Sequence, residues 1–265
     1  TRAEFSLTRT IGQLVMAFVG VFVGVRVDRF GGRPIMLWGA TVLCMTLIAH
    51  SFIHSLLLWW LLNGVLLTVG CAMVGNLVVN VTLSKWFVVN RGKAIAFAAM
   101  GISFGGVVMT PLATVLIDEL GWRAAWIWLG VGTAVILYPV ALFMRRAPED
   151  YGLNPDGLTD VQFSTGAGAR ARLEYANAFT RREALRSVSF YALVIAFGFF
   201  SINIVVLLLQ TVPYLTDNGF SRNEAAFAMF IASVPAMISK PLWGYLIDLT
   251  PAKPLAAISA SLTGL

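Results

Sequence analysis

The sequence has 265 residues, of which 58% are hydrophobic and only 12% charged, with a mean hydropathy of +0.80 and a net charge of +6. A soluble domain is about 25% charged, so this composition excludes one and indicates a chain surrounded mainly by lipid. The basic residues lie between apolar runs, which favours membrane loops over a nucleic-acid interface. Only two cysteines occur, Cys44 and Cys71, both within apolar runs, which excludes a disulfide framework.

Eight apolar segments follow one another along the chain, most of them near the roughly 20 residues that a membrane-spanning helix needs. They lie near 9–27, 34–53, 56–84, 92–117, 123–144, 187–214, 224–247 and 254–265. The segments do not alternate apolar and polar residues, so we exclude a transmembrane barrel. We therefore predict an all-α membrane protein, with a last segment that is too short to span and looks truncated.

Basic residues gather in every second gap between these segments. Fourteen lysines and arginines lie in one set of gaps and four in the other, when Lys240, which lies within a span, is left out. The basic-rich side is expected to be cytoplasmic, in a multi-pass protein of the plasma (inner) membrane. Residues 146–186 form a long gap on this side, for which a solvated tether and a surface-bound amphipathic helix both remain open.

Two loops that are 220 residues apart carry the same pattern. In each loop a glycine precedes an aspartate by four positions, a basic residue follows the aspartate by five, and proline comes next. These residues are Gly24, Asp28, Arg33 and Pro34 in the first loop and Gly244, Asp248, Lys253 and Pro254 in the second. Glycine lets two helices approach closely, and paired charges can cap helix ends at the membrane edge. The repeat predicts a duplicated helix–loop–helix unit.

The first loop, with Arg29 directly after Asp28, resembles the G-x-x-x-D-R-x-G-R signature that follows the second helix of the major facilitator superfamily. The second loop resembles the decayed copy after the eighth helix, although Leu249 replaces its arginine. The resemblance implies a two-bundle helical fold, truncated to about 8 of 12 transmembrane helices. Residues 1–145 would hold helices 2–6, residues 146–186 a cytoplasmic linker, and residues 187–265 helices 7 and 8 with the start of helix 9.

Three further elements resemble the monocarboxylate and oxalate–formate branch of this family. They are Ser84-Lys85-Trp86-Phe87 with Arg91-Gly92-Lys93-Ala94, then Gly121-Trp122-Arg123, and finally the run from Pro148 to Gly157. The resemblance implies a secondary transporter that moves a small organic anion, with a proton or a counter-anion as coupling partner, by alternating access. The signature loops imply conformational gating by Gly24, Asp28, Arg29, Arg33, Asp248 and Lys253.

Lys240 is the single lysine or arginine that lies more than one residue inside a predicted span. A charge at the bilayer centre costs roughly 2.5–3.5 kcal/mol, so a function or a partner is expected for it. In the branch that this segment resembles, a cation spaced like Lys240 from a following proline and glycine meets the substrate carboxylate. Some members carry an aspartate four residues earlier, where this chain has Ala236. Substrate binding and snorkelling to the cytoplasmic interface both remain open.

Other polar residues within the spans are candidates for the lining of a substrate cavity. Asn76 and Asn80 lie four residues apart, as do Gln210 and Tyr214, so each pair shares one helix face. Asparagines can equally bond between helices, and a tyrosine can anchor at the interface. The glycines of Gly101-x-x-x-Gly105 permit close helix packing.

The sequence predicts no enzyme, cofactor or metal site, because we find no nucleophile elbow, phosphate loop or third ligand beside His50 and His54. We expect a monomer in the lipid bilayer, with a small organic anion as substrate and no nucleic-acid partner. Efflux of a neutral or hydrophobic compound and a non-transporting membrane sensor are the alternatives.

Overall fold

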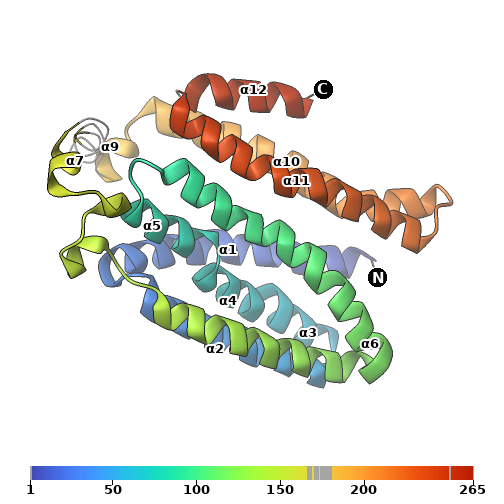
Figure 1. The fold of residues 1–265 in the computed structure, drawn as a ribbon. Helices are drawn as coiled ribbons and strands as arrows, with labels where there is room; N and C mark the ends of the chain where they lie inside the picture. The colour runs from blue at the N-terminus through green and yellow to red at the C-terminus, as the bar shows by residue number, and fades with distance from the viewer. Residues whose placement is uncertain (1, 166–168, 170–172, 174–180, 251, 265) are drawn as a thin grey trace.

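The computed structural model describes residues 2–165, 169, 173, 181–250 and 252–264, and the regular elements within these ranges are all helical. Two groups of helices lie side by side (Figure 1). The larger group holds α1–α6 and the smaller holds α10, α11 and α12. The all-α expectation is therefore confirmed.

The first two long helices form a hairpin with a very tight turn. Helix α1 spans Arg2–Phe30 and α2 spans Gly32–Ala49, followed by the short 3-10 helix η1 at His50–Phe52. Gly31 joins them in the left-handed region, with φ at 82°, which is open to glycine at little cost. A Cβ on Gly31 would also meet Cβ of Arg146 at 2.7 Å, so two constraints select glycine here.

The segment predicted as one helix over 56–84 is broken into shorter pieces. They are α3 at Leu56–Trp59, the π-helix η2 at Trp60–Leu66, α4 at Leu67–Val74 and α5 at Asn76–Trp86. The break lies at Gly75, whose backbone is extended with ψ at −163°. Glycine gains least from the helical state, so an interruption falls there most readily.

The fourth and fifth predicted segments belong to one continuous element, α6, at Arg91–Phe143. Its 53 residues contain one non-helical position, Gly121, with φ at 77°. The chain reverses direction near this residue, so α6 is a hairpin of two arms (Figure 1). The predicted boundary between 92–117 and 123–144 therefore lies where the structure turns.

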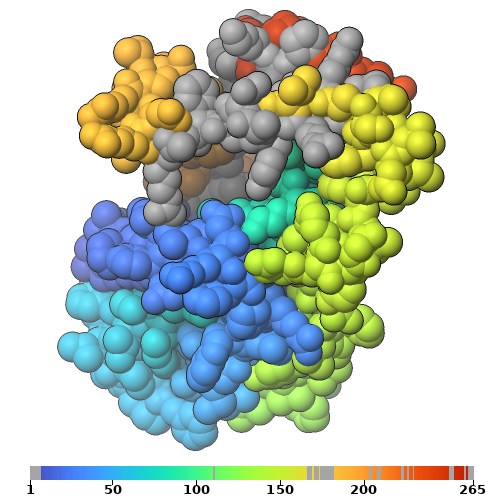
Figure 2. Space-filling view, turned by 90° about the vertical axis from the view of Figure 1, so that its left-hand side faces the viewer, coloured from blue at the N-terminus to red at the C-terminus, as the bar shows by residue number. Residues whose placement is uncertain are grey.

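Short helices follow α6 before the second group begins. They are η3 at Pro148–Tyr151, η4 at Pro155–Gly157, α7 at Asp160–Ser164 and α9 at Arg181–Ala184. Figure 2 shows this end of the molecule, where the yellow residues of this segment follow the green arm of α6 along one side. The proposed amphipathic helix within 170–186 lies mostly outside the described residues.

The second group is built from α10 at Val188–Asp217, α11 at Arg222–Leu249 and α12 at Ala252–Gly264. Ser221 and Glu224 form a capping box that fixes the start of α11. Pro213 does not end α10, which continues to Asp217 because a proline in the last turns removes only one hydrogen bond.

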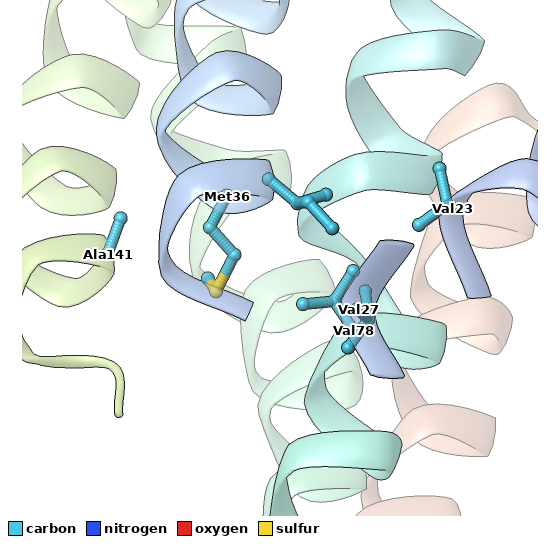
Figure 3. Close-up of a cluster of buried hydrophobic side chains, with 6 residues drawn as sticks. Val23, Val27, Met36, Val78 and Ala141 are labelled. Atoms are coloured by element: carbon cyan, nitrogen blue, oxygen red, sulfur yellow. The ribbon is translucent and has the colours of Figure 1, made fainter. Parts of the chain in front are cut away.

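Six helices of the described chain are long and apolar enough to cross a membrane, and one of them is the reversing α6. A small core lies between α1, α2, α5 and α6 (Figure 3). It comprises Val23, Val27, Ile35, Met36, Val78 and Ala141. Many large apolar side chains are exposed, as in Phe143 at 81%, which suits contact with lipid.

Candidate functional site: the seam between α6 and α11

The aspartate of the second repeat loop caps a helix of the other group. Asp248, at the end of α11, accepts hydrogen bonds from the backbone N–H groups of Gly92 at 2.7 Å and Lys93 at 2.9 Å. These two groups lie in the first turn of α6, where backbone N–H groups have no partner within the helix. The local N-cap residue, Asn90, makes no side-chain capping bond. Asp248 therefore caps α6 and places its negative charge at the positive end of the helix.

Two glycines let the helices approach closely beside this cap. A Cβ on Gly92 would lie 2.8 Å from the carbonyl oxygen of Gly244, and a Cβ on Gly244 would overlap Cβ of Ala96. Neither position accepts a larger side chain without separating the helices. Gly244 is buried within this contact. The glycine of the second repeat loop is thus explained by a contact between the two groups of helices.

Lys240 lies two helical turns farther along α11 and also faces α6. Its ammonium donates hydrogen bonds to the carbonyl oxygen of Ala99 at 2.9 Å and to Oγ of Ser103 at 2.7 Å. Both acceptors are neutral. Among the described residues, no carboxylate is within hydrogen-bonding distance of this ammonium. Within the described chain, this partly buried cation is therefore held by dipoles rather than by a counter-ion.

These contacts lie in register along one line. Lys240, Gly244 and Asp248 are spaced by four residues, which places them on one face of α11. They meet, in reverse order, residues of the first arm of α6, as expected for helices that run antiparallel. We call this line the α6–α11 seam, which comprises Gly92, Lys93, Ala96, Ala99 and Ser103 on α6 and Lys240, Gly244 and Asp248 on α11.

The first repeat loop makes contacts within its own group. Lys85 donates to the backbone carbonyl of Asp28 at 3.2 Å, and its ammonium lies 3.7 Å from the Asp28 carboxylate. The side chain of Asp28 is 64% exposed, so this ion pair contributes about 0–1 kcal/mol. The guanidinium of Arg29 lies 5.6 Å from the ring centre of Phe30.

In the two repeat loops, the structure describes the surroundings of Arg33 and Gly24, but not the side chain of Lys253. Arg33 is exposed at the start of α2. A Cβ on Gly24 would make ordinary contact with Leu77, at 3.8 Å. Lys253 lies in α12, but its side chain falls outside the described residues.

Asn76 lines a cavity of about 1020 Å³, to which the first arm of α6 also contributes. The cavity is lined by residues of α1, α2, α4, α5 and α6, and most of its lining is apolar. Ile102 faces it, whereas the adjacent Ser103 binds Lys240. Lys240 is not among the described residues that line the cavity. Asn80 is half-buried one turn from Asn76 on α5 and is not part of the cavity lining.

The two candidates on α10 lie apart from both the seam and the cavity. Gln210 is exposed, and the side chain of Tyr214 is 66% exposed. Among the described residues, the structure does not bring either of them to Lys240. His50 is buried between the rings of Trp59 and Trp126, with Nδ1 2.7 Å from the carbonyl oxygen of Thr46.

Sequence reasoning missed the α6 side of the seam. Ala99 and Ser103 carry no motif, and Ala99 contributes only its backbone oxygen. The close packing that Gly101 and Gly105 permit is not made within the described chain, because nothing described lies within 4 Å of a Cβ at either position. The close approach occurs at Gly92 instead. The small residues Gly92, Ala96 and Ala99 recur at intervals of four and three, a helical-face signal that could have identified this surface.

The fold and the seam define a class of protein: a multi-pass helical membrane protein in which two groups of helices meet along polar contacts. The family model of the Major Facilitator Superfamily matches residues 1–265. The chain therefore belongs to the major facilitator superfamily, and its fold is a truncated form of the two-bundle fold of that family. This confirms the resemblance of the two repeat loops.

Its relatives belong to the branch that the shorter motifs indicated. Monocarboxylate transporter 4 of Rattus norvegicus is 26% identical over 254 residues, covering 94% of this chain and 51% of the relative. The oxalate:formate antiporter of Oxalobacter formigenes is 27% identical over 246 residues, covering 90% of this chain and 53% of the relative. The chain thus spans about half the length of these curated relatives.

Proposed function

We propose that the full-length protein is a secondary transporter that moves a small organic anion, such as a monocarboxylate, across the membrane by alternating access. Residues 1–145 and 187–265 would belong to two bundles that rock against each other, with 146–186 as a cytoplasmic linker. The names of the monocarboxylate and oxalate:formate relatives support the substrate class. The positive charge of alternate loops supports a cytoplasmic position for the linker.

The observation that carries this proposal is the environment of Lys240. A lysine ammonium has three N–H donors, and two of them bind Ala99 and Ser103. The third donor and the uncompensated charge are available to a carboxylate. A substrate anion would thus supply the counter-ion that the described chain does not place there, which offsets the cost of holding the cation within the membrane.

The same residue couples binding to movement in this scheme. Lys240 joins α11 to α6, so a carboxylate that competes for its N–H donors weakens one contact of the seam. Asp248 and Gly92 form the second contact, at the end of the seam nearest the basic loops. Bound substrate therefore lowers the free energy needed to separate the two helices at their cytoplasmic ends.

A second candidate function is the efflux of a neutral or hydrophobic compound. The observation that favours it is the large cavity beside Asn76, whose lining is mainly apolar. Such a surface suits a ligand with substantial hydrocarbon area. In this case transport would be insensitive to removal of the Lys240 charge.

Flux through proteoliposomes that contain the full-length protein separates the two functions. Uptake of radiolabelled lactate, formate and oxalate would be measured for wild type, Lys240→Ala and Lys240→Arg, with Arg182→Ala as a control that removes an exposed cation outside the spans. Carboxylate uptake that is lost in Lys240→Ala and retained in the control supports the first function. Preloading with unlabelled anion, or imposing a pH gradient, identifies a counter-anion or a proton as coupling partner.

A further inference from the structure

A second carboxylate binds the chain just before the α6 cap. Asp156 accepts hydrogen bonds from the backbone N–H groups of Val88 at 2.7 Å, Val89 at 2.8 Å and Asn90 at 3.1 Å. The side-chain amide of Asn90 adds a fourth bond, at 3.2 Å. Three consecutive backbone N–H groups form an anion-binding nest, and the chain fills it with its own aspartate.

The segment around Asp156 holds this carboxylate in place. Asp156 has φ at 58°, the one non-glycine residue with positive φ among those described. This conformation is strained for most side chains, but asparagine and aspartate adopt it more readily. The neighbouring Pro155 is buried, and Asn154 donates to the carbonyl oxygen of Leu158 at 3.2 Å. A strained and braced residue therefore points its carboxylate at the α5–α6 loop.

The two aspartates bind one short stretch of chain from two different segments of the molecule. Asp156 holds the N–H groups of residues 88–90, and Asp248 holds those of Gly92 and Lys93. Asp156 lies in the segment that follows the second arm of α6, whereas Asp248 belongs to α11. When α11 moves away, the first contact can persist while the second breaks.

We propose that Asp156 is a positioning residue for the cytoplasmic closure, which fixes the α5–α6 loop so that the N–H groups of Gly92 and Lys93 meet Asp248. The inference rests on the proposed transport function, because closure matters only in a transport cycle. The geometry itself does not depend on which substrate is moved. Without the Asp156 carboxylate, the nest of residues 88–90 loses its anion, and the first turn of α6 no longer has a fixed orientation toward α11.

Electrostatics agrees with this geometry. Burial by itself raises the pKa of the Asp156 carboxyl. The hydrogen bonds from Val89, Val88 and Asn90 outweigh burial, so the pKa lies below its ordinary value. The side chain is therefore charged at neutral pH, as the nest requires.

The test measures the distance between α6 and α11 in the full-length protein. Spin labels would be attached at Phe97→Cys and Leu249→Cys, two exposed positions, in a background with Cys44 and Cys71 replaced by alanine. Double electron–electron resonance would be recorded for wild type, Asp156→Asn and the control Glu149→Gln. The asparagine suits the left-handed backbone, and Glu149 is an exposed acid of the same segment.

The expected result is a rise of about threefold or more in the separated population for Asp156→Asn, with no change for Glu149→Gln. Equal distance distributions in Asp156→Asn and wild type would overturn the proposal. If Asp156→Asn cannot be purified, Asn90→Ala removes the fourth bond, together with the bond that Asn90 Oδ1 accepts from the Lys93 ammonium at 3.2 Å. It should shift the distribution the same way by less, and no shift there also overturns the proposal. Because the measured distance does not depend on flux, this result can be interpreted even if the protein does not transport carboxylates.

Discussion

The carboxylate of Asp248 lies 2.7 Å from the amide nitrogen of Gly92, although 156 positions separate the two residues in the sequence. The contact joins the second repeat loop to the first turn of a helix in the other group. An N-cap contributes about 1 kcal/mol, and a charge at a helix start adds about 0.3–1 kcal/mol. A bond of this strength can close the seam and still release it during a transport cycle.

Asp248→Asn is expected to open this end of the seam. The amide keeps one acceptor oxygen but loses the charge and turns N–H donors toward the donors of Gly92 and Lys93, so about 1–2 kcal/mol of closure is lost. The measurement is the same label pair at positions 97 and 249, which should report a larger separated population. Asp118→Asn, an exposed acid near the far end of the first arm of α6, should leave the distances unchanged.

Gly244→Ala is expected to destabilise the closed seam, because its methyl group would overlap Ala96. Overpacking of this kind costs about 1–3 kcal/mol. Thermal unfolding in detergent should show a lower midpoint than wild type. Gly101→Ala is the matched control, since a Cβ there meets open space and alanine favours the helix. A midpoint for Gly244→Ala equal to that of Gly101→Ala would contradict the close approach.

Much of the fold could be predicted from the sequence, because long apolar segments and the charge of the loops between them identify membrane spans. The reversal at Gly121 lies between two predicted segments, and the repeat of Gly24 and Gly244 indicated the family. The break at Gly75 could not be predicted, since the apolar run continues through it. A glycine in a membrane helix can break the helix, permit close packing, or, like Gly101, have nothing described within 4 Å of its Cβ position.

The candidate site was less accessible to sequence reasoning. Lys240 was identified because a charge in an apolar run is unusual, but its acceptors on α6 lie 141 and 137 residues earlier in the sequence. A backbone oxygen such as that of Ala99 has no sequence signal. Similarly, Asp156 was noted within a branch motif, whereas its contact with residues 88–90 depends on how the chain returns after α6.

Ser103→Ala is expected to strengthen the binding of a carboxylate. The substitution removes one acceptor of the Lys240 ammonium, so a second N–H donor becomes available and the seam opens more readily. The dissociation constant of lactate or oxalate, measured by calorimetry on the purified full-length protein, should fall about threefold. Ser239→Ala is the control, because that hydroxyl bonds only within its own helix, to Ala236. Weaker binding in Ser103→Ala than in the control would show that the serine serves the substrate rather than the seam.

The Asp156 contact should be insensitive to pH in the physiological range. Its pKa is lowered in the folded protein, so its stabilising effect is present above the ordinary aspartate pKa of about 3.9 and is lost as the pH falls through the lowered value. Wild type should unfold at a higher temperature than Asp156→Asn at pH 7, and the gap should narrow below about pH 4. A gap that already closes between pH 7 and pH 6 would contradict a charged Asp156.

The most direct test of the account is uptake of radiolabelled lactate, formate and oxalate by the full-length protein in proteoliposomes, compared between wild type and Lys240→Ala. We predict saturable uptake of at least one of these anions by wild type, and a loss of about tenfold or more in kcat/KM without the ammonium. Lys240→Arg, which retains the charge, should keep part of the activity. Carboxylate uptake by Lys240→Ala at the wild-type rate would contradict the assignment of Lys240 as the anion-binding residue.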